Sequence, residues 1–157
     1  MITEIVKNVV TGKITTRQIQ ETDISIEQIR SEKLRELPEI VNAVRSVGMA
    51  FQFNNSDYHI QTGLHDINNW TSALTRLYRM TDTSATHWVR TQENVTIHPT
   101  VSECILLMEQ AQDYHYALLI ANGTVKDAIK AMTIKTDLSS LDVQATFSTA
   151  LQAILNP

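Results

Sequence analysis

The stretch of sequence that decides the fold runs from Arg45 to Thr96 and reads RSVGMAFQFNNSDYHIQTGLHDINNWTSALTRLYRMTDTSATHWVRTQENVT. Gly48 follows a helical pattern of apolar residues and is a typical helix stop. Residues 49–53 then alternate in the period of a strand, residues 54–57 (NNSD) have the composition of a turn, and residues 58–62 alternate again. This pattern predicts an antiparallel β-hairpin directly after a helix.

The same stretch continues with a helix and a second hairpin. Apolar residues at helical spacing predict a helix over residues 64–78, and the polar residues 81–84 (TDTS) predict a loop after it. Residues 87–97 read as a second short hairpin with its turn at residues 92–94.

The chain before this stretch predicts a hairpin and a long helix. Residues 2–20 look extended, with Gly12 placed to form a tight turn. A lone two-stranded hairpin is marginal in water, so this one must lean on the main body or on another chain. Ser25 and Gln28 form a capping box that opens a helix, and Pro38 predicts either a kink or a junction of two helices.

The chain after this stretch is helical. Residues 101–121 predict the longest and most apolar helix, closed by a left-handed cap at residues 122–123 (Asn-Gly). Residues 125–132 predict a shorter helix, residues 137–140 a polar loop, and the final helix ends at Leu155.

Together these elements predict a helix-rich α+β fold, with short antiparallel β-hairpins between helices and a further hairpin at the N-terminus. The predicted boundary divides residues 1–24, a hairpin used for attachment, from residues 25–157, the helix-rich body. A chain of 157 residues can bury roughly two thirds of its unfolded surface without a metal or disulfide.

Composition excludes several classes of protein. The apolar fraction of 43% and charged fraction of 19% are those of a globular chain, not a disordered one. The net charge is −4 and opposite charges are interleaved, which argues against nucleic acid or an anionic membrane as a partner. The sequence has no secretory signal pattern and no run of ~20 apolar residues, so we expect folding in a cytoplasm. Cys104 has no partner for an intramolecular disulfide and is expected in the core.

Motifs for chemistry are absent from the sequence. The four glycines are too scattered for a phosphate loop, no histidine pair or second cysteine suggests zinc, and no G-x-S-x-G elbow is present. We therefore predict no catalytic residue, no metal site and no cofactor.

Several histidine and acidic residues could have either a chemical role or an ordinary surface or packing role. His59, His65 and Asp66 flank the first hairpin and could form an acid–base or metal set, but histidines at a hairpin edge are usually surface residues. His98 at a strand end has the same interpretation. Residues 113–116 (DYHY) are consecutive on a helix, point to different faces and cannot converge on one ligand.

Large aromatic side chains invite a binding role as well as a packing role. Phe51, Phe53 and Trp88 occupy alternating hairpin positions, where packing onto helices is expected. Tyr58 and Trp70 fit core and partner surface about equally.

Several segments resemble a family of phage tail-associated modules, a domain of unknown function found in tail-fibre, baseplate and tail-accessory proteins. The resemblance covers about residues 45–151. Its motifs are Arg45 before Gly48, the aromatics at 51 and 53, IQT at 60–62, WVRT at 88–91, NVT at 94–96, VSE at 101–103, His115, the short helix through Ile129 and residues 138–142. Residues 8–13 (NVVTGK) are similar to entry segments of phage tail-fibre and fibre-assembly proteins.

The resemblance implies a non-enzymatic structural component of a bacteriophage tail, associated with the fibre or baseplate. Its partners would be other phage tail proteins and further copies of itself, with a trimer favoured, and its location the virion tail after synthesis in the bacterial host. A tail-fibre assembly chaperone and a receptor-binding tip that touches the host surface are the alternatives. Predicted assembly contacts are Ile2, Val6, Val9, Ile14 and Ile19, and predicted exposed loop contacts are Asn54, Asn55, Asp57, Tyr58, Thr81 and Asp82.

Overall fold

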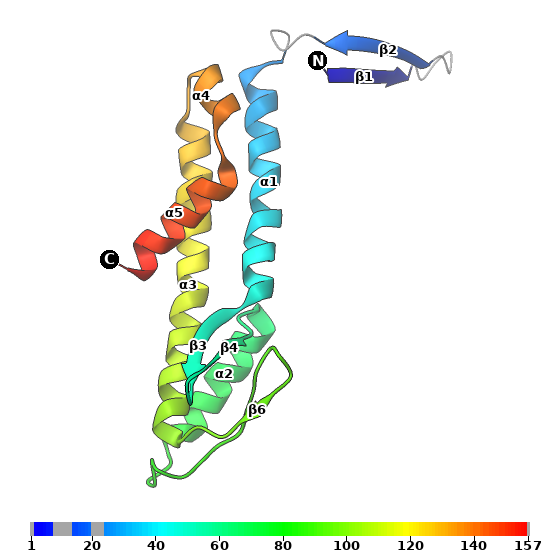
Figure 1. The fold of residues 1–157 in the computed structure, drawn as a ribbon. Helices are drawn as coiled ribbons and strands as arrows, with labels where there is room; N and C mark the ends of the chain where they lie inside the picture. Colours follow the sequence, from blue (N-terminus) through cyan, green and yellow to red (C-terminus); the bar gives the residue numbers. More distant parts are fainter. Residues whose placement is uncertain (1, 8–13, 20–23, 157) are drawn as a thin grey trace.

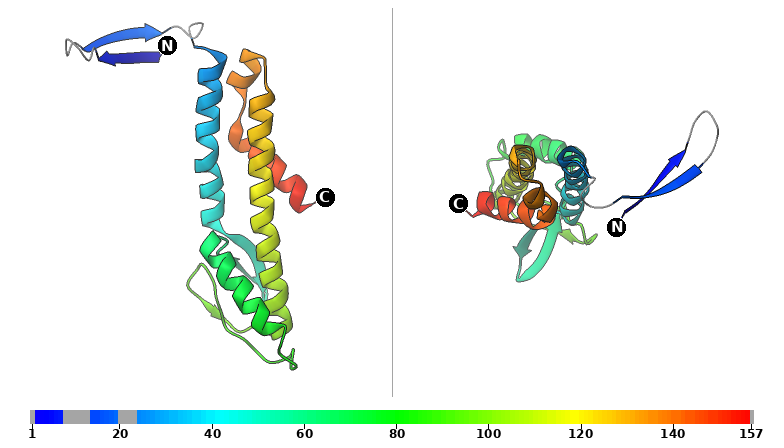
Figure 2. Two further views of the ribbon diagram at one scale, coloured as in Figure 1. Left: turned by 180° about the vertical axis from the view of Figure 1, so that it is seen from behind. Right: turned by 90° about the horizontal axis from the view of Figure 1, so that it is seen from above.

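Two long helices that run in opposite directions form the axis of the molecule. They are α1 (Ile26–Val47) and α3 (Val101–Ala131), which lie side by side (Figures 1 and 2). The computed structural model describes residues 2–7, 14–19 and 24–156. The shape is that of a rod with smaller elements attached near each end.

The other helices pack on this pair. α2 (Leu64–Leu77) lies against the first part of α3, and α5 (Val143–Leu155) lies across its second part (Figure 1). α4 (Lys135–Ser140) connects α3 to α5 and contacts α1.

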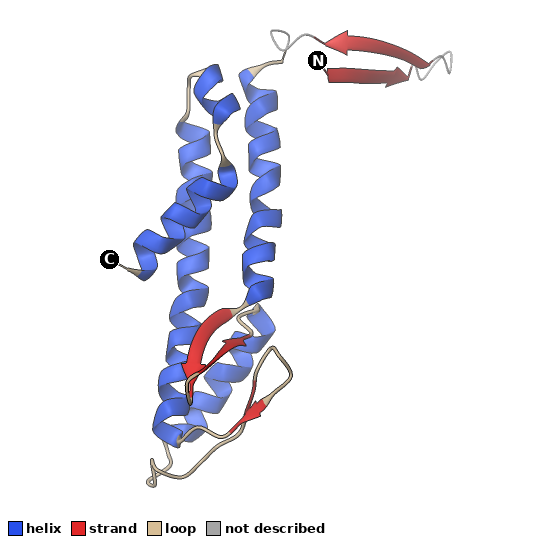
Figure 3. Ribbon diagram, in the orientation of Figure 1, coloured by secondary structure: helices blue, strands red, loops and turns tan. Residues whose placement is uncertain are grey.

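The strands form three antiparallel pairs near the ends of the rod (Figure 3). The pairs are β1 (Ile2–Lys7) with β2 (Ile14–Ile19), β3 (Met49–Phe53) with β4 (Ser56–Ile60), and β5 (Val89–Arg90) with β6 (Thr96–Ile97). The predicted helix-rich α+β fold with short antiparallel hairpins between helices is therefore confirmed, as are the three hairpins.

Local sequence signals explain where α1 begins and ends. The Ser25 hydroxyl accepts a hydrogen bond from the Gln28 backbone at 3.2 Å, and the Gln28 side chain accepts one from the Ser25 backbone at 2.8 Å. Gly48 ends the helix with a φ of 80°. Pro38 lies inside one uninterrupted helix, so the predicted alternative of two helices meeting there is wrong. Its ring is on the exposed side, while the neighbouring Leu37 packs inward.

The predicted cap at Asn122-Gly123 is wrong, because α3 continues through it to Ala131. A glycine inside a helix costs about 1 kcal/mol relative to alanine. Burial of Val125 and Ile129, which extend the apolar stripe of α3 into the core, outweighs that cost. The predicted polar loop over residues 137–140 is also wrong, since Leu138 is buried and anchors the short helix α4.

The interior consists of two apolar clusters stacked along α3. The first surrounds Phe147 and Leu118, where α1, α3, α4 and α5 meet. The second surrounds Ile60 and Cys104, where α2, α3 and the second and third hairpins meet. The half-buried ring of Tyr114 packs against both clusters, so α3 is the element they share. The core position predicted for Cys104 is confirmed.

The aromatic predictions are confirmed for Phe51 and Phe53, which are half-buried against the second cluster. The core prediction for Trp88 is wrong: this side chain is 64% exposed and stacks on His87. The adjacent Val89 is buried, and successive side chains of an extended segment point to opposite sides. Only one of the two residues could therefore face the core.

Candidate functional site

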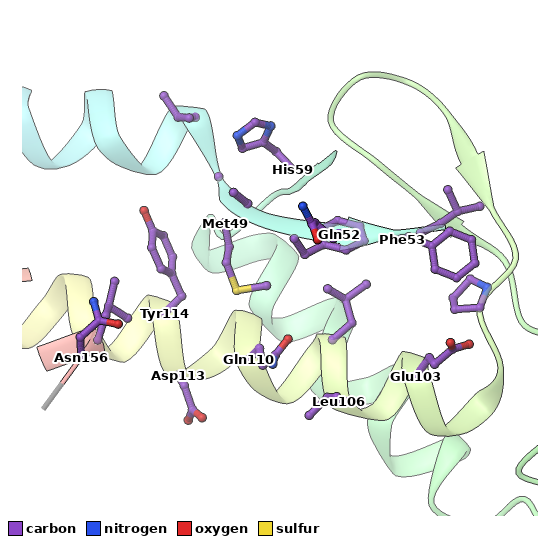
Figure 4. A pocket seen from close by; sticks show the side chains of 18 residues that line it. Met49, Gln52, Phe53, His59, Glu103, Leu106, Gln110, Asp113, Tyr114 and Asn156 are labelled. Carbon is purple, nitrogen blue, oxygen red and sulfur yellow. The ribbon is translucent and has the colours of Figure 1, made fainter. Parts of the chain in front are cut away.

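An open groove with a volume of about 980 Å³ lies between β3 and α3. In Figure 4 the side chains of Met49, from β3, and Tyr114, from α3, point into the space between the two elements. Leu155 and Asn156, at the end of α5, close the groove at one end.

The floor of the groove is a face of α3 that other helices leave uncovered. Further along α3, the buried Ala117 and Ala121 belong to the same cluster as α5. About two and three turns before Ala117 on the same face lie Gln110 and Leu106, which line the groove instead. Leu106 is 55% exposed, so an apolar side chain remains open to solvent on the floor.

The wall opposite α3 is held in place by Gly48. A Cβ atom at this position would lie 2.5 Å from the Ile60 carbonyl oxygen, so only glycine lets α1 turn into β3 so close to β4. The Gln92 side chain donates a hydrogen bond to the Ser46 carbonyl and fixes the last turn of α1 against the loop between β5 and β6.

One acidic residue binds the two hairpins together beside the groove. The Glu93 carboxylate accepts hydrogen bonds from the His59 ring Nδ1 at 2.8 Å and from the His59 backbone N–H at 3.0 Å. The bond from the His59 side chain stabilises the charged carboxylate and lowers the pKa of Glu93 from 4.5 to about 2. The contact between His59 and Glu93 is therefore structural, since each side chain already has the other as its hydrogen-bond partner.

Two carboxylates, those of Glu103 and Asp113, line the groove itself. Glu103 accepts hydrogen bonds from the Thr100 backbone at 2.7 Å and the Thr100 hydroxyl at 2.8 Å, and these bonds hold its pKa below the usual range. It is thereby committed to the capping box of α3. Asp113 is exposed at the edge and adds a negative charge to the groove.

The structure does not bring His59, His65 and Asp66 into one set. His59 bonds to Glu93 instead, while His65 and Asp66 lie in the first turn of α2. Within the described residues, no group of three or more His, Cys, Asp or Glu side chains could hold a metal ion. The expectation that residues 113–116 diverge is confirmed, because Asp113 is exposed whereas His115 is buried.

The predicted loop contacts lie in two separate places. Asn54 and Asn55 form the exposed turn between β3 and β4, with φ values of 50° and 60°. Asp57 is exposed on β4 and accepts a hydrogen bond from the Gln52 side chain at 2.9 Å. Tyr58 is half-buried, with its ring 6.0 Å from that of Phe51.

The other two loop residues, Thr81 and Asp82, are exposed in the segment after α2. Asp82 accepts hydrogen bonds from the backbone and hydroxyl of Ser84, which stabilise the loop locally and lower the pKa of Asp82. This segment lies at the end of the rod away from β1 and β2 (Figures 1 and 2).

The predicted assembly contacts fall in the N-terminal hairpin. The strand register places Ile2 opposite Ile19, Val6 opposite Thr15, and Ile14 opposite Lys7. Val9 lies outside the described residues.

Sequence reasoning missed the groove and its floor. Its residues come from β3, α3 and the end of α5, and their convergence has no local signal. The one available signal was the unusually apolar character of α3, which leaves Leu106, Tyr116, Leu119 and Ile120 exposed on the helix surface.

In three comparisons with known proteins, no family model, no curated protein and no solved structure matched this chain. A search of the described residues for a helix with the length and hydropathy of a membrane span found none.

Proposed function

We propose that this chain is a non-enzymatic structural component of a bacteriophage tail, associated with the fibre or baseplate, which acts through contacts with other tail proteins. The phage assignment rests on the sequence resemblance over residues 45–151. The observation that supports a role in assembly is the groove, which combines an apolar floor with a strand at its wall. Such a combination suits the binding of another polypeptide segment.

The shape of the molecule fits this proposal. The β1–β2 hairpin is drawn to one side of the start of α1 (Figures 1 and 2), whereas the groove lies at the other end of that helix, where Val47 lines it. Two attachment regions at different ends let a protein connect neighbours on both sides. Copies of the chain would then repeat by symmetry, with a trimer as the expectation from the resemblance.

The test is quantitative mass spectrometry of purified phage particles, counting this chain against a known tail protein. We expect a fixed stoichiometric number of copies in every preparation, resistant to washing with salt. Absence from particles, together with abundance in infected cells, would reject the structural role.

The exposed apolar side chains of α3 favour a tail-fibre assembly chaperone as a second candidate. Leu119 and Ile120 are 45% and 56% exposed, and exposed apolar patches commonly mark binding surfaces. A chaperone would co-purify with the fibre protein from infected cells and be missing from finished particles. The same mass spectrometry separates the two roles.

The exposed loop after α2, which contains Thr81 and Asp82, favours a receptor-binding tip as a third candidate, because this loop lies at the end of the rod remote from the β1–β2 hairpin (Figure 1). A purified tip protein would compete with phage for adsorption to host cells. Adsorption that is unchanged at saturating protein would reject this role.

A further inference from the structure

The two outer edges of the β3–β4 hairpin differ in their hydrogen bonding. Phe53 and Ser56 flank the two-residue turn and form the closing pair of the ladder, so β3 residues at odd positions bond to β4. The backbone groups of even-numbered β3 residues and of their partners on β4 therefore point outward. His59, the partner of Ala50, is one of these outward residues.

The outer edge of β4 is covered by the neighbouring hairpin. The His59 carbonyl accepts a hydrogen bond from the Gln92 backbone at 2.8 Å, and the His59 N–H donates to the Glu93 carboxylate at 3.0 Å. This contact protects that edge from pairing with another strand.

The outer edge of β3 is open along the groove. Ala50 and Gln52 line the groove, and within the described residues their outward backbone groups have no hydrogen-bond partner. An unpaired strand edge beside an apolar floor is a template for an added strand. The groove therefore accommodates an extended polypeptide segment.

The β1–β2 hairpin is a two-stranded sheet that could supply such a segment, because no other described strand pairs with it. In the described residues β1 and β2 pair only with each other, and Figures 1 and 2 draw them apart from the helical body. A two-stranded sheet is marginal by itself, and three or more strands stabilise it. Each six-residue strand is long enough to pair along the five residues of β3.

The hairpin and the groove are at opposite ends of α1. The 22 residues of α1 span about 33 Å at 1.5 Å per residue, so the hairpin as placed does not reach its own groove. Each chain thus offers one donor hairpin and one acceptor edge in separate places. A contact of this kind is head-to-tail, and it generates either a ring or an open chain.

We propose that the groove binds the β1–β2 hairpin of a second copy of this chain, which extends the β3–β4 sheet by strand addition at Ala50 and Gln52. This inference rests on the proposed role in assembly and names a partner for it. It makes self-association a property of the purified protein, independent of any other tail component.

The test measures the mass of the full-length chain by light scattering over a range of concentrations. We expect assemblies whose mass is a multiple of 17.7 kDa. Leu106→Asp, on the groove floor, should return the chain to the monomer mass or raise the dissociation constant at least tenfold. Leu64→Asp, at the exposed start of α2 outside the groove, is the matched control and should leave the assembly unchanged.

A complementation experiment tests the direction of the contact. Ile5→Pro with Thr16→Pro removes backbone donors from both strands of the donor hairpin and leaves the groove intact. This chain and the Leu106→Asp chain should each be monomeric. Mixed together they retain one usable donor and one usable acceptor, so they should form a complex of two chains and nothing larger.

Three outcomes overturn the inference, provided that circular dichroism shows the variants folded. These are a wild-type chain that stays monomeric at all concentrations, an assembly that survives both sets of substitutions, and an assembly broken equally by Leu64→Asp. None of them bears on whether the chain is present in phage particles, so failure here and failure of the proposed function are distinguishable.

Discussion

The Glu93 carboxylate bonds to one residue twice, accepting hydrogen bonds from the ring and from the backbone of His59. The two residues are 34 positions apart and belong to different hairpins. Together with the hydrogen bond from the Gln92 backbone to the His59 carbonyl, this contact holds the loop between β5 and β6 against the edge of β4, and so leaves only the β3 edge of that hairpin open.

The first prediction concerns the pH dependence of this contact. The pKa of Glu93 in the folded chain, about 2, is below its ordinary value of 4.5. Its contribution to stability is therefore fully present above about pH 4.5 and is lost as pH falls through 2. Glu93→Gln should lower the melting temperature at pH 7, and the difference from wild type should shrink toward zero near pH 2.

Glu39→Gln, on the exposed side of α1, makes the same change in net charge and is the control. Thermal melts followed by circular dichroism at pH 7, 4, 3 and 2 provide the measurement. An equal loss of melting temperature at pH 7 in the two variants would contradict the stabilising role of the contact between Glu93 and His59.

The second prediction compares two glycines with opposite roles. Gly48→Ala should destabilise the fold by about 1–3 kcal/mol, because the positive φ and the nearby Ile60 carbonyl leave no room for a side chain. Gly123→Ala should stabilise it by about 1 kcal/mol, because this helical position has open space around it. Urea denaturation should show a lower free energy of unfolding for Gly48→Ala and a higher one for Gly123→Ala. A change of the same sign in both variants would refute the different backbone roles of the two glycines.

The third prediction concerns the buried histidine of α3. The His115 ring Nδ1 lies 3.0 Å from the Thr62 carbonyl oxygen, and both residues are buried. His115→Leu keeps the bulk of the side chain but leaves that carbonyl unpaired, at a cost of about 1–3 kcal/mol. Lys126→Ala, on the exposed side of the same helix, should change the free energy of unfolding by less than about 0.5 kcal/mol.

The fourth prediction concerns the thiol of Cys104. Burial, together with the nearby Glu103 carboxylate, raises the pKa of this thiol to about 11. At pH 8 the native chain should therefore react with a disulfide reagent far more slowly than the chain unfolded in urea. Complete reaction of the native protein within seconds would place Cys104 at the surface.

Sequence predicted those parts of the fold that depend on short-range signals. These signals determine structure within a few residues of their own position. They are the capping box at Ser25 and Gln28, the helix stop at Gly48 and the alternation through the second hairpin. Each was confirmed, because no distant contact competes with them.

The errors arose where packing between distant segments decides. Asn122-Gly123 has the composition of a cap, yet contacts of the following turns with the core keep α3 helical. Trp88 has the residue type of a core aromatic, yet the core accepts the adjacent Val89 instead.

The groove could not be predicted for the same reason. Met49 and Leu106 are brought to the same groove only by the way the second hairpin rests on α3. Asn54 and Thr81 are exposed, as their turn composition indicates, whereas the exposure predicted for Tyr58 is wrong because its half-buried ring lies beside that of Phe51.

Sharing of α3 between the two apolar clusters has a mechanical consequence. Its 31 residues span about 46 Å, and both clusters are anchored to that one helix. Force applied to one cluster is passed to the other through this helix, so we expect the two clusters to unfold in one transition rather than one after the other.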